Sequence, residues 1–302
     1  MVARGEMATY QHSRPKGWIT DWRPQSKTLQ LLEHVDEVLA TYQEHLPLTA
    51  RQIFYRLVAI HGYEKTENGY ERLCGVIVRA RRARRIKFDA IRDDGWIAER
   101  PMVWESPAGL IKTFRAAAKA YERDKEARQP RRLAVIVEAA GMVPQAARVA
   151  GEFSVPVFSS SGFDSLTVKK QLADLVDEDK RPMVFLHVGD LDPSGVCIFD
   201  ALRADVEAFV ADRESVEFVR LALTPEQVER FRLPTAPPKA TDRRGNNVTE
   251  TCQAEALPPN VLAELIRAAI EQRMDPDILA QDYRDEKYER EEIVKKIEGM
   301  MA

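Results

Sequence analysis

The stretches LAVIVEAAGM (133–142) and FLHVGDLDPSG (185–195) decide the fold class of this chain. In each of them a short apolar run ends at an acidic residue, and loop or turn residues follow. Further apolar runs lie at 155–158 and 216–223, with helical patterns between the runs. Because parallel strands are buried on both faces and need crossover helices, this alternation predicts an α/β domain built on a parallel sheet.

Three carboxylates stand where two of these strands are predicted to end. Glu138 follows the first run, and Asp190 and Asp192 follow the third. The carboxyl ends of parallel strands form the ligand site of such sheets, and residues two apart in an extended chain point the same way. Oxygen ligands favour Mg²⁺, or Mn²⁺ in its place, over zinc. The structural alternative is that Asp192 caps a helix before Pro193 and that Glu138 is a surface acid.

The chain upstream of the sheet has a helical pattern. Residues 1–26 are predicted to form an N-terminal arm, and residues 27–128 a mostly helical domain with helices over 27–42, 50–60, 69–84 and 107–127. The segment that holds Phe88, Ile91 and Trp96 is predicted to supply the strands of a small wing. Residues 129–302 then form the sheet domain with a C-terminal helical extension, whose last helix is predicted over 282–298.

One predicted helix carries a tyrosine among arginines. Thr49 and Gln52 match a capping box, which places the start of the helix at Thr49. On a helical wheel the apolar residues share one side, while Tyr55 lies on the opposite side with Arg51 and Arg56. Two guanidinium groups beside a phenol favour the phenolate and can hold a phosphate. The alternative is an ordinary surface tyrosine at the rim of a helix.

A dense basic run, RARRARRIK (79–87), follows. Its charged residues are Arg79, Arg81, Arg82, Arg84, Arg85 and Lys87. So many like charges repel one another unless a polyanion neutralises them, so these residues, together with Arg56, are predicted to contact DNA phosphates. The run does not separate DNA from RNA. The structural alternative is a solvated run paired with Asp89, Asp93 and Asp94.

Bulk composition narrows the class of protein. The chain has 302 residues, 44% hydrophobic and 31% charged, which is typical of a folded protein with two domains. Net charge is about +4 over residues 1–100 and −7 over the rest, so the N-terminal third is the expected polyanion contact. The chain shows neither a long apolar run nor a signal peptide, which predicts a cytoplasmic protein without a membrane contact. The predicted contact with DNA makes it nucleoid-associated. Three widely spaced cysteines indicate neither a disulfide framework nor a zinc site.

These motifs together resemble a known family. Glu138 after one strand and GDLDPSG (189–195) after a later one look like the Toprim domain of topoisomerases, primases and related nucleases. TARQIFY (49–55) is similar to the winged-helix motif of the topoisomerase VI A subunit and of the related meiotic double-strand-break protein. EALPP (255–259) is a weaker match to the same family. The resemblance covers roughly residues 30–225 and implies a winged-helix domain followed by a Toprim domain.

The resemblance also implies a chemistry. Tyr55 would attack a DNA backbone phosphate and become linked to the 5′ end, with Arg51 binding that phosphate. Mg²⁺ on Glu138, Asp190 and Asp192 would stabilise charge, and Glu138 would double as general acid and base. The family pairs the tyrosine of one protomer with the metal of another, which implies a homodimer acting on double-stranded DNA. The chain is shorter than a typical A subunit, and the ATPase of the family lies on a separate B-type subunit, so cleavage is implied but strand passage is not.

Two other functions fit the same residues. A Toprim nuclease would hydrolyse the phosphodiester with water and give Tyr55 no role. A DNA-binding regulator would use only the winged helix and would have no metal-dependent activity. Whether DNA stays attached to denatured protein separates the first alternative from the tyrosine mechanism.

Overall fold

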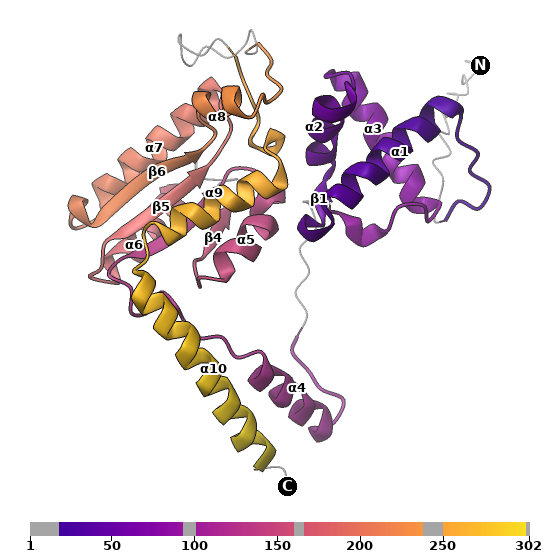
Figure 1. The fold of residues 1–302 in the computed structure, drawn as a ribbon. Coiled ribbons are helices and arrows are strands. Elements are labelled where there is room, and N and C mark those ends of the chain that lie inside the picture. Colours follow the sequence, from indigo (N-terminus) through magenta and orange to yellow (C-terminus); the bar gives the residue numbers. More distant parts are fainter. Residues whose placement is uncertain (1–17, 93–100, 160–165, 238–249, 300–302) are drawn as a thin grey trace, which may run out of the picture.

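The computed structural model describes residues 18–92, 101–159, 166–237 and 250–299 (Figure 1). It is a mixed α/β structure in which a parallel sheet lies beside a group of helices, as the apolar runs predicted. Trp96, expected in a small wing, lies outside the described residues. Among those residues no helix is both long and apolar enough to cross a membrane.

The four predicted strands form one parallel sheet with the spatial order β4-β3-β5-β6. The strands are β3 (Arg132–Val137), β4 (Val157–Ser159), β5 (Met183–Val188) and β6 (Val216–Ala222). The connections that leave β3 and β5 carry the chain in opposite directions along the sheet. The boundary between these two strands is therefore a topological switch point, where ligands of open α/β sheets bind.

Helices cover both faces of the sheet, which explains why its central strands are apolar throughout. The helices on one face are α5 (Val143–Gly151) and α9 (Pro259–Glu271), and those on the other are α6 (Leu166–Asp177) and α7 (Pro193–Phe209). Leu133 and Val135 of β3 belong to the core on the first face, while Ala134 and Ile136 belong to the core on the second. A short helix, α8 (Pro225–Arg230), follows β6.

The N-terminal part, residues 18–92, is here called the helical unit. It contains α1 (Ser26–Thr41), α2 (Ala50–His61) and α3 (Glu67–Arg82), within a few residues of the predicted helices. Thr49 and Gln52 form the predicted capping box at the start of α2. Two short strands, β1 (Leu48–Thr49) and β2 (Ile91–Arg92), pair in parallel beside α2.

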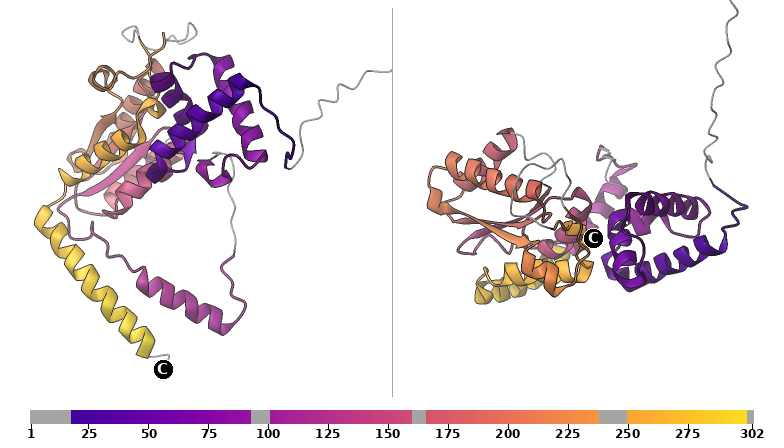
Figure 2. Two further views of the ribbon diagram at one scale, coloured as in Figure 1. Left: turned by 45° about the vertical axis from the view of Figure 1, so that its right-hand side comes forward. Right: turned by 90° about the horizontal axis from the view of Figure 1, so that it is seen from above.

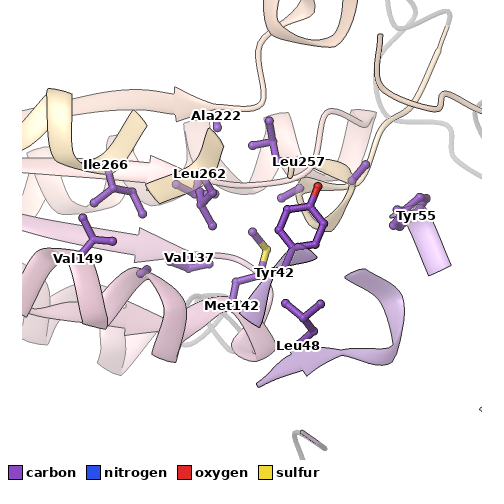
Figure 3. Close-up of a cluster of buried hydrophobic side chains, with 14 of the residues drawn as sticks. Tyr42, Leu48, Tyr55, Val137, Met142, Val149, Ala222, Leu257, Leu262 and Ile266 are labelled. Atoms are coloured by element: carbon purple, nitrogen blue, oxygen red, sulfur yellow. The ribbon is translucent and has the colours of Figure 1, made fainter. Parts of the chain in front are cut away.

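The helical unit lies beside the carboxyl end of the sheet and contacts the 3-10 turns Ala140–Met142 and Ala254–Ala256 there (Figures 1 and 2). Buried residues of both parts belong to one continuous core. Figure 3 shows Tyr42 and Leu48 of the helical unit beside Met142 and Leu257 of the sheet side. Polar bonds cross the same boundary: Gln145 Nε2 donates to the carbonyl oxygen of His45 at 3.1 Å. Helix α2 also contacts the 3-10 turn Ala254–Ala256 across this boundary.

The remaining two helices, α4 (Pro107–Lys119) and α10 (Pro276–Gly299), pair with each other away from the sheet. Helix α4 was predicted as part of the N-terminal domain and as extending to residue 127. It ends earlier because residues 121–128 turn back along α10, where Arg123 Nε binds Asp282 Oδ1 at 2.9 Å and Lys125 Nζ binds Glu286 Oε2 at 2.6 Å. The last helix, α10, was predicted over 282–298 but begins earlier, at Pro276, where Asp275 Oδ1 accepts a hydrogen bond from the backbone N–H of Ile278 at 3.1 Å.

Candidate functional site

The three predicted carboxylates meet at the switch point of the sheet. Glu138 follows β3, and its Oε2 accepts a hydrogen bond from the backbone N–H of Asp190 at 2.8 Å. Asp190 Oδ1 accepts from the backbone N–H of Ala254 at 2.7 Å, and Asp192 Oδ1 accepts from that of Gly195 at 2.5 Å. Each carboxyl group thus uses one oxygen on a backbone donor and retains a second oxygen.

Two glycines allow the loop to come this close. A Cβ atom at Gly189 would lie 2.6 Å from Glu138 Oε2 and 2.4 Å from His187 Cε1. A Cβ atom at Gly195 would lie 2.6 Å from the carbonyl oxygen of Asp190 and 3.3 Å from Glu138 Oε2. Any side chain at either position would therefore push the carboxylates apart, because atoms at such distances overlap.

The alternative roles expected for these residues are partly confirmed. Asp192 is the N-cap of α7, with Pro193 in the first turn, so the capping role considered for it is real. Glu138 is not a surface acid, because it is largely enclosed and bonded to the loop that carries Asp190. The neighbouring His187 is a core residue, because it is only 1% exposed and packs on Phe199 with ring centroids 4.8 Å apart.

The electrostatics of the cluster are those of crowded acids. Burial, followed by repulsion from Asp190 and Asp192, raises the pKa of Glu138 to about 7. Burial also raises the pKa of Asp190. Arg220 partly offsets this crowding, because its Nη2 donates to the carbonyl oxygen of Asp190 at 2.5 Å. Burial lowers the pKa of Arg220, and the charges of Glu138, Asp190 and Asp192 oppose that effect. A divalent cation would relieve the same repulsion.

Carboxylate oxygens are suitable ligands for Mg²⁺, but in this structure those of Glu138, Asp190 and Asp192 are not arranged around one point. Among the described residues no group of three His, Cys, Asp or Glu side chains is close enough to hold a metal ion. The backbone N–H groups that donate to Glu138, Asp190 and Asp192 hold the three carboxyl groups in separate orientations. Binding would therefore require the free oxygens to turn toward one point.

We expect Glu138→Gln to stabilise the metal-free protein at high pH. The pKa of Glu138 is about 7 in the folded protein, whereas its ordinary value is 4.5. The folded state therefore binds the proton more tightly than the unfolded state does. The stability that this adds is fully present below pH 4.5 and is lost as the pH rises through 7. Glutamine keeps the acceptor for Asp190 and cannot ionise. Thermal unfolding in EDTA should show variant and wild type alike near pH 4.5 and separated by up to about 3 kcal/mol at pH 8. As a control, the variant Glu178→Gln at an exposed position should have the same stability as the wild type at every pH. A difference in stability between Glu138→Gln and the wild type that does not change with pH would contradict this account.

Tyr55 lies against the segment that binds Asp190, not in solvent. Its hydroxyl donates to Gln253 Oε1 at 2.5 Å, and the next residue, Ala254, donates to Asp190. Tyr55 is only 7% exposed, so the alternative of a surface tyrosine at the rim of the helix is wrong. The apolar side of α2 packs on the other helices, and the polar side packs on residues 253–256.

The expected activation of the phenol is also corrected. Burial raises the pKa of Tyr55 above its usual value, with a smaller opposing effect from Arg51. Arg51 is directed elsewhere: its Nη1 donates to Gln253 Oε1 at 2.9 Å, and its Nε lies 3.9 Å from Glu255 Oε2. In this structure, Gln253 therefore holds both the phenol and its neighbouring guanidinium.

Arg56 does not have the position expected of a DNA contact. It is 4% exposed, and its Nη2 donates to the carbonyl oxygen of Ala256. Arg56 thus joins α2 to the 3-10 turn at 254–256, and its guanidinium is out of reach of a phosphate.

The basic run is mostly at the surface. Arg79, Arg84, Arg85 and Lys87 are exposed, and Arg81 and Arg82 are half-buried at the end of α3. Of the aspartates considered as partners, Asp93 and Asp94 lie outside the described residues, and Arg85 Nη2 instead lies 3.7 Å from Asp36 Oδ2. The contact of these basic residues with DNA phosphates therefore remains a prediction.

Three residues of the site were missed by the sequence analysis. Gln253 bonds Tyr55 and Arg51, Arg220 lies beside the carboxylates, and Tyr70 of α3 lies 5.4 Å under the guanidinium of Arg51. A pocket of about 300 Å³ lies next to them, lined by Arg51, Tyr70, Arg92 and Glu255 among others. The EALPP motif (255–259) does not include Gln253, and nothing in the spacing of Tyr70 or Arg220 distinguishes them from other residues.

Comparison with known proteins adds no assignment to this geometry. No family model matches the chain, and neither the curated proteins nor the solved structures contain a match. The site must therefore be interpreted from its own residues.

Proposed function

We propose that this chain cleaves DNA by phosphoryl transfer at the edge of the sheet where Glu138, Asp190 and Asp192 meet. The observation that carries the proposal is that these carboxylates follow strands at one topological switch point, where Glu138 is bonded to the backbone of Asp190, and that Tyr55 and Asp190 are bonded to the adjacent residues Gln253 and Ala254. A phenol and crowded carboxylates in one place suit the cleavage of a phosphodiester better than a purely structural role.

The finer organisation proposed is a winged-helix domain followed by a Toprim domain, as in the topoisomerase VI A subunit. In support, the helix that carries Tyr55 follows β1, which pairs with a second short strand. The sheet that carries the carboxylates is parallel and doubly covered.

Mg²⁺, held by Glu138, Asp190 and Asp192, would neutralise charge on the phosphoryl oxygens and the leaving 3′ oxygen. Tyr55 Oη would form a bond to phosphorus as the bond from phosphorus to the 3′ oxygen breaks, which leaves the 5′ end on the tyrosine. Glu138, whose pKa is about 7, would accept the phenolic proton near neutral pH and return a proton to the 3′ oxygen. Arg51, with a half-exposed side chain, would bind the phosphate.

This mechanism requires Tyr55 to leave Gln253. In the enclosed position the phenol is protonated and cannot reach a duplex. Binding of DNA would have to separate α2 from residues 253–256. A homodimer, in which the tyrosine of one protomer serves the carboxylates of the other, would provide two such sites for both strands. A separate ATPase subunit would be needed for any change of DNA topology.

One observation favours a second candidate, a nuclease that uses water. The burial and raised pKa of Tyr55 are those of a structural phenol, whereas the pKa of Glu138 suits a general base for water. In that case the same carboxylates would hold Mg²⁺ and the products would carry no protein.

The test is to incubate the full-length protein with end-labelled duplex DNA and Mg²⁺, and then denature it in detergent. Labelled DNA that migrates with the protein until protease is added supports the tyrosine mechanism. Mg²⁺-dependent cleavage with free ends supports the hydrolytic alternative. An absence of any cleavage with Mg²⁺ or Mn²⁺ would reject both.

A further inference from the structure

Two aromatic rings are exposed at the end of α3, beside the basic run. Trp18 is 55% exposed and Phe88 is 53% exposed. Their ring centroids are 5.7 Å apart, with an edge-to-face arrangement. They come from segments about 70 residues apart, so the fold has brought them together at the surface.

Each ring is covered on one face by an arginine of the basic run. The guanidinium carbon of Arg84 lies 4.5 Å from the centroid of Trp18, and that of Arg81 lies 4.5 Å from the centroid of Phe88. We call Trp18, Phe88, Arg81 and Arg84 the aromatic–arginine platform. Cation–π contacts of this kind hold rings in place while they remain accessible to solvent.

The backbone fixes the same arrangement. The N–H of Ile19 donates to the carbonyl oxygen of Arg82 at 3.0 Å, which anchors the segment that carries Trp18. Arg81 Nη2 donates to the carbonyl oxygen of Phe88 at 3.0 Å. Arg84 has a φ angle of 59°, in the left-handed region that non-glycine residues seldom adopt. These bonds keep the rings in place without burying them.

We propose that the aromatic–arginine platform binds unpaired bases of a DNA strand. Accessible ring faces interleaved with guanidinium groups are the combination that binds single strands, because bases stack on the rings and phosphates bind the cations. A duplex keeps its base faces stacked internally, so it can use only the arginines. The inference rests on the proposed binding of DNA, but not on cleavage, and it adds that the preferred DNA carries a single-stranded stretch next to the duplex.

The test measures binding of fluorescein-labelled oligo(dT) of about 15 nucleotides to the full-length protein by anisotropy, in EDTA so that no cleavage occurs. Phe88→Ala and Trp18→Ala should each weaken binding of the single strand about tenfold and binding of a blunt duplex by less than about twofold. The matched control is Phe114→Ala on α4, a side chain that is likewise 53% exposed but outside the platform. It should bind both DNAs as the wild type does.

Four results would overturn the proposal. The first is that both ring variants bind oligo(dT) as tightly as the wild type, which would show that charge alone binds DNA. The second is that they weaken duplex binding as much as single-strand binding. The third is that Phe114→Ala has the same effect as the ring variants. The fourth is that oligo(U) binds more tightly than oligo(dT). Since no step involves Mg²⁺ or Tyr55, selective loss of single-strand binding supports the platform even if no DNA is ever cleaved.

Discussion

Tyr55→Phe is expected to abolish the covalent protein–DNA product completely. Phenylalanine lacks the oxygen that would bond to phosphorus, so no residual adduct can form through this position. The fold should survive, because only one hydroxyl is removed and Gln253 still accepts a hydrogen bond from Arg51 at 2.9 Å. The measurement is labelled DNA retained on denatured protein after reaction with Mg²⁺.

The matched control is Tyr70→Phe, because Tyr70 is the other phenol near Arg51. It lines the pocket that Arg51 and Glu255 also line, and burial raises its pKa to about 12. The Tyr70 variant should keep the adduct. Loss of the adduct in Tyr70→Phe and retention in Tyr55→Phe would transfer the nucleophile to α3 and contradict the proposed mechanism.

Asp190→Asn is expected to lower the cleavage rate by at least about a hundredfold, whichever nucleophile is used. Asparagine retains an oxygen that can accept the hydrogen bond from Ala254, so the loop should keep its position. It removes one negative charge from the proposed Mg²⁺ ligands, and the loss should appear in the initial rate of strand cleavage.

A second readout does not depend on activity. Mg²⁺ that binds the folded state should raise the melting temperature of the wild type and should not raise that of Asp190→Asn. Asp200→Asn, at an exposed position on α7, serves as the control and should resemble the wild type in both assays. If Asp190→Asn responds to Mg²⁺ as the wild type does, the carboxylates do not hold the ion and the proposal loses its basis.

Much of the sheet could be predicted from the sequence because its determinants are local. The apolar runs at 133–137 and 183–188 can be buried only between two layers, and both became central strands of a parallel sheet. Because the two strands are parallel neighbours, Glu138, Asp190 and Asp192, which follow them in the sequence, lie at the same edge of the sheet. The capping box at Thr49 is local too, and it set the start of α2.

The surroundings of α2 could not be predicted in this way. A helical wheel separates polar from apolar sides, but it cannot show that the polar side is buried by a segment 200 residues later. Arg56 and Tyr55 meet Ala256 and Gln253, so their exposure depends on a tertiary contact without a local pattern. The same limit explains why Gln253 was missed: its role depends on the residues that it meets.

The adjacency of Gln253 and Ala254 has a mechanical consequence. One peptide group separates the acceptor of the Tyr55 hydroxyl from the donor to the Asp190 carboxylate. A shift of that dipeptide alters the surroundings of both groups at once. Leu191 and Cys252 also exchange backbone hydrogen bonds at 2.8 and 2.9 Å, so residues 252–254 and the loop of Asp190 are tied together. Whatever pulls residues 253–254 away from α2 thus frees the Tyr55 hydroxyl and displaces the Asp190 carboxylate in the same motion.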